Sequence, residues 1–318
     1  MLPWTESPFL EKQLAESSLQ DWEKKLVRDY ARDGYVIVDS KISDTLLSMA
    51  AISMLPSFKK IKGADKRIQD AWKRSAFVKD VATSPWIMSL LRILYQRTPI
   101  PFQTLNFPEG TQQDTHSDMI HFNSIPERFM CGVWVAFEDI TDFNGPLHYY
   151  PRSHKLPFYD MIDIGVKASS NVSSKKAFMV YAENYTSFIK EMITELVLEK
   201  KTLNIKKGQA IIWSANLLHG GNKILQPGSS RHSQVTHYFF EDCMYYTPRL
   251  SDIAINKVHL RDLTNIATGE RVINKYFGKK IRPNASLYLE QETIRMFNSI
   301  VHLFPREIVE TVKKIIYR

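Results

Sequence analysis

The stretch "FMCGVWVAFEDI" (Phe129–Ile140) is typical of a buried β-strand, because a short apolar and β-branched run ends there in acidic residues. Comparable runs follow one another from Pro101 to about Leu250, separated by Pro, Gly, Asn and Asp. They are FQTLNF (102–107), MIHF (119–122), LHYYP (147–151), KTLNI (201–205), QAIIW (209–213) and VTHYFFED (235–242). Short strands at this spacing predict an antiparallel sandwich or barrel over residues 101–250.

Helical spacing dominates the chain before this core. Three helices are predicted, over 20–33, 43–58 and 84–97, together with one strand, "YVIVDS" (35–40). Ser43 provides an N-cap signal for the second helix, and Ser84 with Pro85 provides one for the third. Residues 1–100 are therefore expected to form a helical support that contains one strand.

Two further helical regions are predicted. One is an insertion near 184–200, within the strand-rich core, and the other is a C-terminal extension over 251–318, where helical spacing returns. With no internal repeat or low-complexity tract, the chain is expected to be a single domain, 1–318, mainly β with helical decoration.

Composition limits the classes of function. No run is long and apolar enough for a membrane span, and the N-terminus lacks the layout of a secretory signal, so a cytoplasmic protein is expected. The net charge of +8 is not accompanied by interleaved aromatic and basic residues, which argues against a nucleic-acid partner. Residues 251–318 carry twelve Lys/Arg against seven Asp/Glu. The basic helix predicted at 303–318 is expected to pack on the core, with peripheral contact to anionic lipid as the alternative. Nothing in the sequence indicates an oligomeric state.

A metal site is predicted in "QQDTHSDMIHF" (112–122). The chain has only two cysteines, far apart, so a metal would have to be held by histidine and carboxylate. On a strand, His116 and Asp118 point to one side and can share one ion, whereas His121 points to the other side. The best remote third ligand is His219, which follows the strand QAIIW and precedes two glycines that let the backbone pass close to a site.

An arginine completes the pattern. Arg231 enters the aromatic strand that follows, and a buried guanidinium needs an anionic partner. Two histidines and one carboxylate form the facial triad of non-haem Fe(II) oxygenases, whose open positions take a 2-oxo acid and then dioxygen. A planar guanidinium suits the distal carboxylate of that acid. Two other interpretations remain: Zn²⁺ at the same ligands, which leaves Arg231 unexplained, and three unrelated polar residues.

Several segments together resemble the phytanoyl-CoA dioxygenase family of Fe(II)/2-oxoglutarate-dependent oxygenases. They are DGYVIVDSKIS (33–43), THSDMIHF (115–122), CGVWVAFEDITDFNGPLHYYPRSHK (131–155), GQAIIWSANLLHGGN (208–222) and SRHSQVTHYFF (230–240). The resemblance covers about 33–241 in order and implies a double-stranded β-helix, or jelly-roll, core. One departure is Arg152, which stands where the family has a glycine before "SHK".

The resemblance also implies roles for individual residues. It makes His116, Asp118 and His219 the iron ligands and catalytic centre, and Arg231 the clamp on 2-oxoglutarate. Trp134 and Gln103 match positions that face the cosubstrate, and a hydroxyl from Ser233, or alternatively Thr236, can reach the same carboxylate. His148, His154, His232 and His237 are interpreted as structural or surface histidines, and His121 and Asp114 as loop groups with a possible substrate contact.

The predicted function is an Fe(II)/2-oxoglutarate-dependent dioxygenase. It would hydroxylate a small metabolite, acyl thioester or sugar-containing precursor with O₂, with succinate and CO₂ as co-products. The alternative is a non-catalytic module that uses the same fold to bind a ligand or partner.

Overall fold

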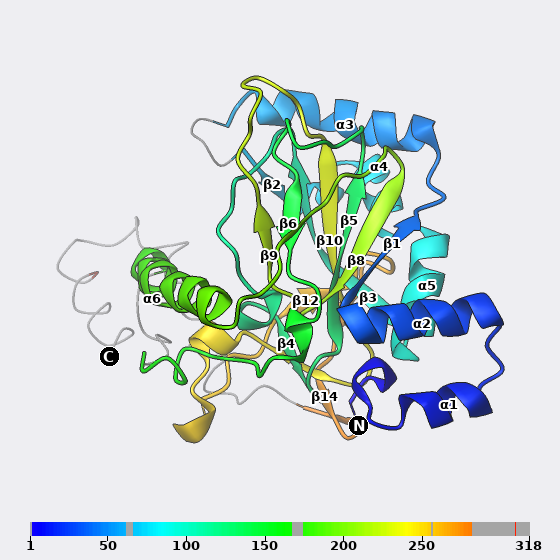
Figure 1. Ribbon diagram of the computed structural model, residues 1–318, viewed down its shortest axis with the longest axis vertical. Coiled ribbons are helices and arrows are strands. Elements are labelled where there is room, and N and C mark those ends of the chain that lie inside the picture. Colours follow the sequence, from blue (N-terminus) through cyan, green and yellow to red (C-terminus); the bar gives the residue numbers. More distant parts are fainter. Residues whose placement is uncertain (1, 62–65, 167–173, 256, 282–308, 310–318) are drawn as a thin grey trace.

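The computed structural model describes residues 2–61, 66–166, 174–255, 257–281 and 309 (Figure 1). Its helices are α1 (Leu10–Glu16), α2 (Asp21–Asp33), α3 (Asp44–Phe58), α4 (Ala76–Ala82), α5 (Pro85–Tyr95) and α6 (Ser174–Glu195). The strands of the core are β1 (Tyr35–Asp39), β2 (Ile68–Gln69), β3 (Pro99–Phe107), β4 (Asn123–Ile125), β5 (Met130–Ala136), β6 (Leu147–Tyr149), β7 (Lys201–Thr202), β8 (Gln209–Ser214), β9 (His219–Gly221), β10 (Ser233–Phe240) and β11 (Met244–Tyr246).

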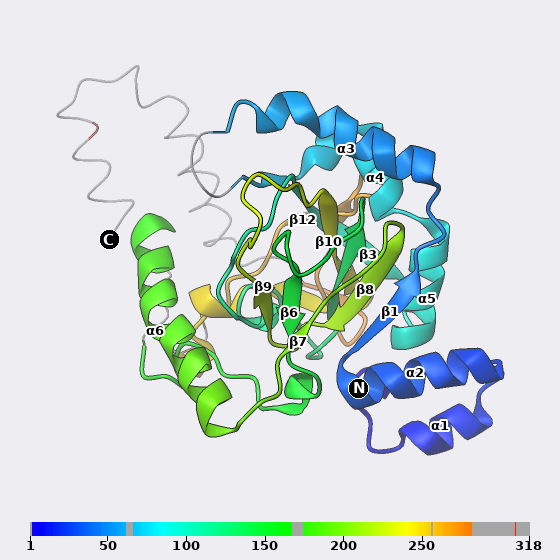
Figure 2. The ribbon, with the colours of Figure 1, turned by 45° about the horizontal axis from the view of Figure 1, so that its top comes forward.

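Two antiparallel sheets form the core. The larger sheet has the strand order β1-β8-β5-β10-β3-β2, and the smaller one has the order β7-β6-β9. Isolated bridges extend the smaller sheet, and β4 pairs with β11 beside it. The two sheets are seen around a common interior in Figure 2. This arrangement is the predicted jelly roll, mainly β with helical decoration, and that prediction is confirmed.

The alternation of side chains on β5 separates the two faces of the larger sheet. Val133 and Val135 belong to the apolar cluster that packs against the helices. Trp134 and Ala136 belong to a second cluster, which includes Tyr149 of the smaller sheet. A strand buried on both faces reads as a continuous apolar run, which is why "VWVAF" lacks polar residues. The residue parity along each strand therefore decides which side chains can reach the interior.

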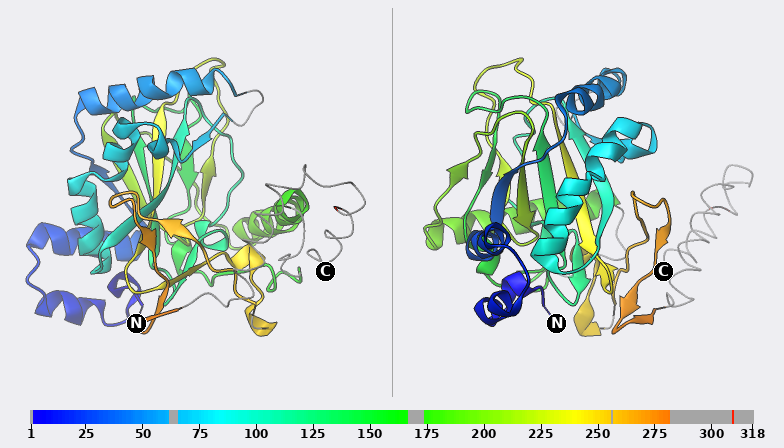
Figure 3. Two further views of the ribbon diagram at one scale, coloured as in Figure 1. Left: turned by 180° about the vertical axis from the view of Figure 1, so that it is seen from behind. Right: turned by 90° about the vertical axis from the view of Figure 1, so that its right-hand side faces the viewer.

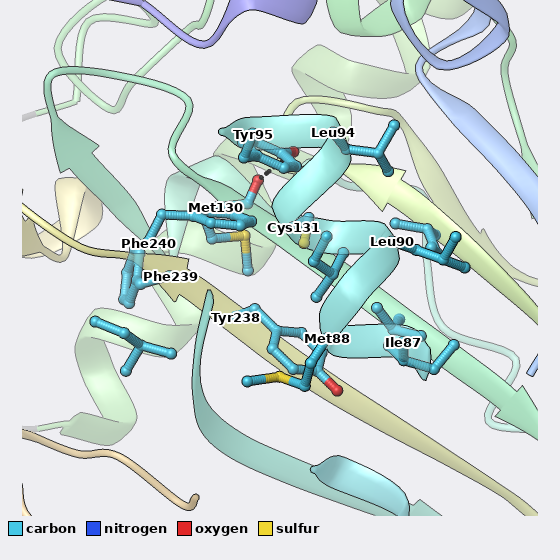
Figure 4. Packing of buried hydrophobic residues seen from close by; sticks show 14 of the residues in the cluster. Ile87, Met88, Leu90, Leu94, Tyr95, Met130, Cys131, Tyr238, Phe239 and Phe240 are labelled. Atoms are coloured by element: carbon cyan, nitrogen blue, oxygen red, sulfur yellow. Dashed lines mark hydrogen bonds between the residues drawn. The ribbon is translucent and has the colours of Figure 1, made fainter. Parts of the chain in front are cut away.

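Helices α3, α4 and α5 cover the outer face of the larger sheet (Figure 3). Figure 4 shows α5 packed on β5 and β10 with Met88 beside Tyr238 and Tyr95 beside Met130, and the hydroxyl of Tyr95 donates to the carbonyl of Met130 at 3.2 Å. Each fully buried side chain of this size contributes about 1.5–3 kcal/mol relative to exposure. The helices thus hold the sheet rigid from outside and leave its inner face for a site.

The predicted helix starts are close to the observed ones. Ser43 is the N-cap of α3, and its hydroxyl accepts from the amide of Leu46. Ser84 precedes α5 and Pro85 is the first helical residue, as expected, but the Ser84 side chain makes no capping bond. The predicted strand over 35–40 is β1, and it pairs with β8 at one edge of the larger sheet. It is therefore part of the jelly-roll core and not only of the N-terminal support.

Three predictions of secondary structure are wrong in detail. The helical insertion expected near 184–200 is α6, which begins ten residues earlier in the chain, at Ser174, and ends at Glu195. The strand expected at 119–122 is a 3-10 helix over Asp118–Ile120. In the described residues 251–255 and 257–281, the expected helical extension is limited to a 3-10 turn at Ile253–Ile255. Short pairs form there instead, β12 (Leu263–Thr264) with β13 (Arg271–Val272) and β14 (Lys275–Tyr276) with β15 (Lys279–Lys280).

The turns between these short strands explain the last difference. Gly269 and Gly278 both have positive φ, 76° and 75°, and each allows a tight reversal of the chain where a helix would have to continue. The basic helix predicted at 303–318 lies outside the described residues apart from Val309. In the part of the chain that the structure describes, no helix combines the length and apolar character that a membrane crossing requires.

Candidate active site

His116 and His219 are brought together by backbone pairing. They form an isolated antiparallel bridge in which each amide donates to the other residue's carbonyl at 3.0 Å. Directly opposed residues of such a pair project their side chains to the same side, and the two imidazole rings lie 4.6 Å apart. A Cβ at Gly220 would meet the carbonyl oxygen of Gln113 at 2.8 Å, so the segment before His116 can approach only a glycine there.

The hydrogen bonds of the two imidazoles leave the same nitrogen available in each ring. Nδ1 of His116 lies 2.9 Å from the carbonyl of Asp114, and Nδ1 of His219 lies 3.0 Å from the carbonyl of Leu217. A carbonyl can only accept, so Nδ1 carries the proton and Nε2 the lone pair in both neutral rings. Metal-ligating histidines are commonly oriented by such a bond from the other ring nitrogen.

Asp118 supplies the third ligand atom. Its Oδ1 lies 3.7 Å from Nε2 of His116 and 3.9 Å from Nε2 of His219. One ligand atom of each of the three residues lies within 4.8 Å of those of the other two, and all three side chains are buried. The strand expected here is reduced to the isolated bridge at His116, and Asp118 begins a 3-10 helix, yet its carboxylate still lies beside the two imidazoles.

The second oxygen of Asp118 is held by neighbours. The indole of Trp213 donates to Oδ2 at 2.8 Å, and Nε2 of His237 lies 3.6 Å from the same oxygen. Trp213 reaches it by crossing β5 at Gly132, where a Cβ would meet the indole at 2.3 Å. Oδ2 is thus fixed by β8 and β10, while Oδ1 is directed at the two imidazoles.

Electrostatics favour an ionised Asp118 carboxylate beside a neutral His116 imidazole. Burial alone would raise the pKa of Asp118, but the adjacent His219 and the hydrogen bond from His237 outweigh it and lower that pKa. Burial, together with the nearby His219, lowers the pKa of His116 to about 4. A negative Asp118 and an unprotonated His116 are the forms in which these two residues can bind a divalent metal.

A cavity of about 760 Å³ opens onto these three residues. Arg231 and Trp134 line it, and both carry a buried N–H group, Nε of Arg231 and Nε1 of Trp134, without a hydrogen-bond partner among the described residues. Arg231 is 1% exposed, and within the described part of the chain its guanidinium is bonded only through Nη1, to the carbonyl of Gly145 at 2.8 Å. Burial lowers the pKa of Arg231 to about 10, and the negative charge of Glu138 offsets this desolvation only in part. These groups fit an anion held at the inner end of the cavity.

Of the other residues predicted to face the cosubstrate, Gln103 lines the cavity, whereas Ser233 and Thr236 do not. Gln103 lines the cavity, and its Oε1 accepts from Nδ1 of His237 at 3.1 Å. Ser233 is fully buried, is not part of the cavity wall, and donates to the carbonyl of Arg231 at 3.3 Å. Thr236 lies on the opposite face of β10, where its hydroxyl accepts from Gln234. The family resemblance implied a hydroxyl beside Arg231, from Ser233 or Thr236. Neither residue lies in the cavity wall.

His121 and Asp114 both line the cavity, although His121 was expected to point away from it. The expectation assumed a continuous strand, and the 3-10 helix at residues 118–120 turns the imidazole of His121 back toward Tyr181, 3.1 Å from its hydroxyl. His148 bonds Thr115, and His154 bonds the carbonyl of Ala31, as structural histidines do. His237 was also interpreted as structural, yet it lines the cavity beside Asp118.

Residue parity on β10 could have located His237. It is six residues after Arg231 and so shares its face of the strand, whereas Thr236 does not. Trp213 lacked a comparable signal, because its role depends on the space left by Gly132 on the neighbouring strand. Arg249, His259 and Arg261 also line the cavity, and no spacing in the sequence connects them with it.

A jelly roll with two histidines and one carboxylate facing a cavity defines the class of non-haem metal enzymes that use a facial triad. The profile of the phytanoyl-CoA dioxygenase family matches residues 30–233, so the chain belongs to that family. It is accordingly a 2-oxoglutarate-dependent oxygenase, with iron and 2-oxoglutarate as its cofactor and cosubstrate, as predicted.

Solved structures agree with this fold. The non-haem α-ketoglutarate-dependent epimerase SnoN from nogalamycin biosynthesis has a TM-score of 0.56 and 19% sequence identity, covering 83% of this chain and 96% of its own. The carbocyclase SnoK from the same biosynthesis has a TM-score of 0.53 and 16% identity, over 72% and 87%. EctD from S. alaskensis has a TM-score of 0.50 and 17% identity, over 71% and 78%. A search of curated proteins gave no significant match.

Proposed function

We propose that the chain hydroxylates a small molecule at the metal end of this cavity, and that His116, Asp118 and His219 hold the iron there. The observation that carries the proposal is the convergence of Nε2, Nε2 and Oδ1 on one wall of a cavity that also contains the incompletely bonded Arg231. When bound, Fe(II) with 2-oxoglutarate and O₂ supplies the oxidising chemistry, with succinate and CO₂ as co-products.

The side chains around the triad have separate tasks in this proposal. Arg231 binds the distal carboxylate of 2-oxoglutarate through the N–H groups that its bond to Gly145 leaves available. Trp134 donates its indole N–H into the same space and closes the apolar wall. Trp213 and His237 keep Asp118 in one orientation, so that a single oxygen is presented to the metal.

The shape of the site supports a small substrate. A cavity of about 760 Å³ is within the usual range for small-molecule sites, and it must also contain the cosubstrate. SnoN and SnoK are an epimerase and a carbocyclase, so the fold alone does not select hydroxylation. Hydroxylation is proposed here because it is the reaction that the family resemblance implies.

Anaerobic titration with Fe(II) and 2-oxoglutarate tests the proposal. The wild type is expected to develop a visible metal-to-ligand charge-transfer band and to form succinate when oxygen is admitted. His116→Ala should lose the band, and His232→Ala is the matched control, because His232 lies outside the cavity wall and packs on Phe58. A wild type with no band, or an unchanged band in His116→Ala, would contradict the proposal. A band without succinate in any metabolite pool would favour the non-catalytic alternative.

A further inference from the structure

A second group of cations lies in the same cavity. Arg249 and Arg261 line it together with His259, and all three come from the segment 247–261, beyond the family match at 30–233. Counting all lining residues, four arginines face two aspartates, Asp114 and Asp118. Asp114 is exposed and paired with Lys190, so it does not neutralise the interior. The cavity is therefore more cationic than one cosubstrate clamp requires.

The second group lies near His237, away from the start of β10 where Arg231 stands. The guanidinium carbon of Arg261 is 4.7 Å from the ring centre of Phe122, and that ring is 5.0 Å from the ring of His237, the neighbour of Asp118. His237 follows Arg231 by six residues, most of them in β10, which corresponds to about 20 Å of extended chain. Arg231 and the second group are thus separated along β10, with Asp118 beside His237.

The two arginines are incompletely bonded. Arg261 donates from Nη1 to the hydroxyl of Thr247 at 2.8 Å and to the carbonyl of His121 at 3.4 Å. Its Nε, like the Nε of Arg249, is buried without a partner in the described part of the chain. Among those residues, no carboxylate forms an ion pair with either. Burial lowers the pKa of both guanidinium groups, that of Arg261 to about 10 with a further contribution from Arg249.

Like charges placed together without a counterion destabilise the free protein, and a bound anion would remove that cost. We propose that Arg249 and Arg261 form a second anion site, which binds a carboxylate or phosphate of the substrate itself. The proposal rests on the proposed function, because it assigns the anion to the substrate of the triad. Phe102 and Phe122 lie beneath Arg261 as an apolar wall. The substrate class is therefore an acidic small molecule whose apolar part extends toward the metal.

A structural role of Arg249 and Arg261 must be distinguished from a role in anion binding. Arg261 connects Thr247 to the 3-10 helix through two hydrogen bonds, so its loss could loosen the loop without any ligand being involved. Arg249 makes no hydrogen bond or ion pair among the described residues, and its variant is the more informative one. Arg92 on α5 is exposed and provides the matched control.

The experiment is calorimetric titration with three probes of similar size: benzoate, phenyl phosphate and neutral benzamide. It is performed on the full chain, first alone and then anaerobically with Fe(II) and saturating 2-oxoglutarate, which occupies Arg231. Both anions are expected to bind at least about tenfold more tightly than benzamide, because a charge-assisted hydrogen bond is worth roughly 1.5–3 kcal/mol. Arg249→Gln should lose about tenfold in anion affinity, and Arg92→Gln should lose none. The tighter of the two anions identifies the group that the site prefers.

Equal binding of benzamide and the anions, or unchanged anion binding in both Arg249→Gln and Arg261→Gln, overturns the inference. Affinity of the variants for 2-oxoglutarate, measured by the charge-transfer band, should stay at the wild-type value. The titration of the chain alone does not depend on the metal. If the wild type shows no charge-transfer band, the proposed function fails, and anion selectivity that still depends on Arg249 then supports an anion site without the oxygenase role.

Discussion

The two ends of the cavity are built in different ways. At the metal end, His116 and His219 are fixed by a backbone bridge, and Asp118 is fixed by an indole that crosses a neighbouring strand. At the other end, Arg249 and Arg261 stand on a segment of 3-10 turns and short bridges after the family-matched part of the chain. Rigid sheet positions suit chemistry that needs precise geometry, whereas loops can change to suit a substrate. The comparison indicates that reaction type and substrate choice are encoded in separate parts of this chain.

The largest effect is expected from removing a proposed metal ligand. Asp118→Ala should abolish iron binding and reduce succinate formation by about a thousandfold or more, because it removes the only carboxylate of the triad. Metal content after dialysis and succinate release are the measurements. Asp114→Ala is the control, since Asp114 is four residues earlier, exposed and paired with Lys190. Retained iron in Asp118→Ala would show that the ligands lie elsewhere.

A smaller effect is expected at Arg231, which separates cosubstrate binding from metal binding. Arg231→Gln should weaken 2-oxoglutarate by about a hundredfold, the range for losing one partner of a buried charged pair, while Fe(II) still binds. Arg231→Lys should recover only part of the loss, because an ammonium lacks the planar fork. The readout is the concentration dependence of the charge-transfer band. Normal 2-oxoglutarate affinity in Arg231→Gln would mean that Arg249 and Arg261 bind the cosubstrate carboxylate. The two ends of the cavity would then not have separate roles in cosubstrate and substrate binding.

The grouping of His116, Asp118 and His219 could be predicted from sequence, and the structure brings the three side chains together. The glycines after His219 indicate a close backbone approach, and the family segments fix the order of the ligand candidates. Strand alternation suggested the pair at 116 and 118, although a 3-10 helix begins at Asp118. Even Arg152, which replaces a family glycine, keeps the left-handed backbone with φ of 69° that a glycine adopts easily. Parity also places Trp134 on the inner face and Thr236 on the outer one.

The rest depended on tertiary contacts that no spacing encodes. His121 lines the cavity because a 3-10 helix over Asp118–Ile120 replaces the expected strand, which a period of two does not anticipate. Arg261 is placed by its contacts with Phe122 and Thr247, which are remote from it or separated from it by turns. Residues 251–281 were expected to be helical, and positive φ at Gly269 and Gly278 turned the chain into short strand pairs. Local propensity therefore failed where substrate selection is proposed to lie.

A still smaller effect should follow from loosening Asp118 without removing it. Trp213→Phe keeps the aromatic bulk and deletes the N–H that bonds Oδ2 at 2.8 Å. Residues that orient metal ligands typically contribute about 10–100-fold in metal affinity, so iron should bind roughly tenfold more weakly. Competition with a chelator measures this. Trp86→Phe is the control, because it loses an indole bond of similar length, to the carbonyl of Asp39, on the outer side of the fold. Equal iron affinity in the two variants would argue against a role for Trp213 at the metal.

The smallest effect concerns the charge at the second end. Burial, followed by the positive Arg261 and Arg249, lowers the pKa of His259 from 6.5. Arg249→Gln should raise the His259 pKa toward its ordinary value without reaching it, since burial and Arg261 remain. The imidazole signal followed by NMR against pH measures this, with Arg92→Gln as the control.

The same shift has a consequence for stability. A neutral His259 contributes stability that is present above its unfolded pKa, near 6.5, and lost as pH falls through the lowered folded pKa. Arg249→Gln should reduce that loss of stability at low pH, because protonated His259 then faces one cation fewer. An unchanged His259 pKa would mean that Arg249 does not share a site with His259 and Arg261, and the second end would then be a single-arginine site.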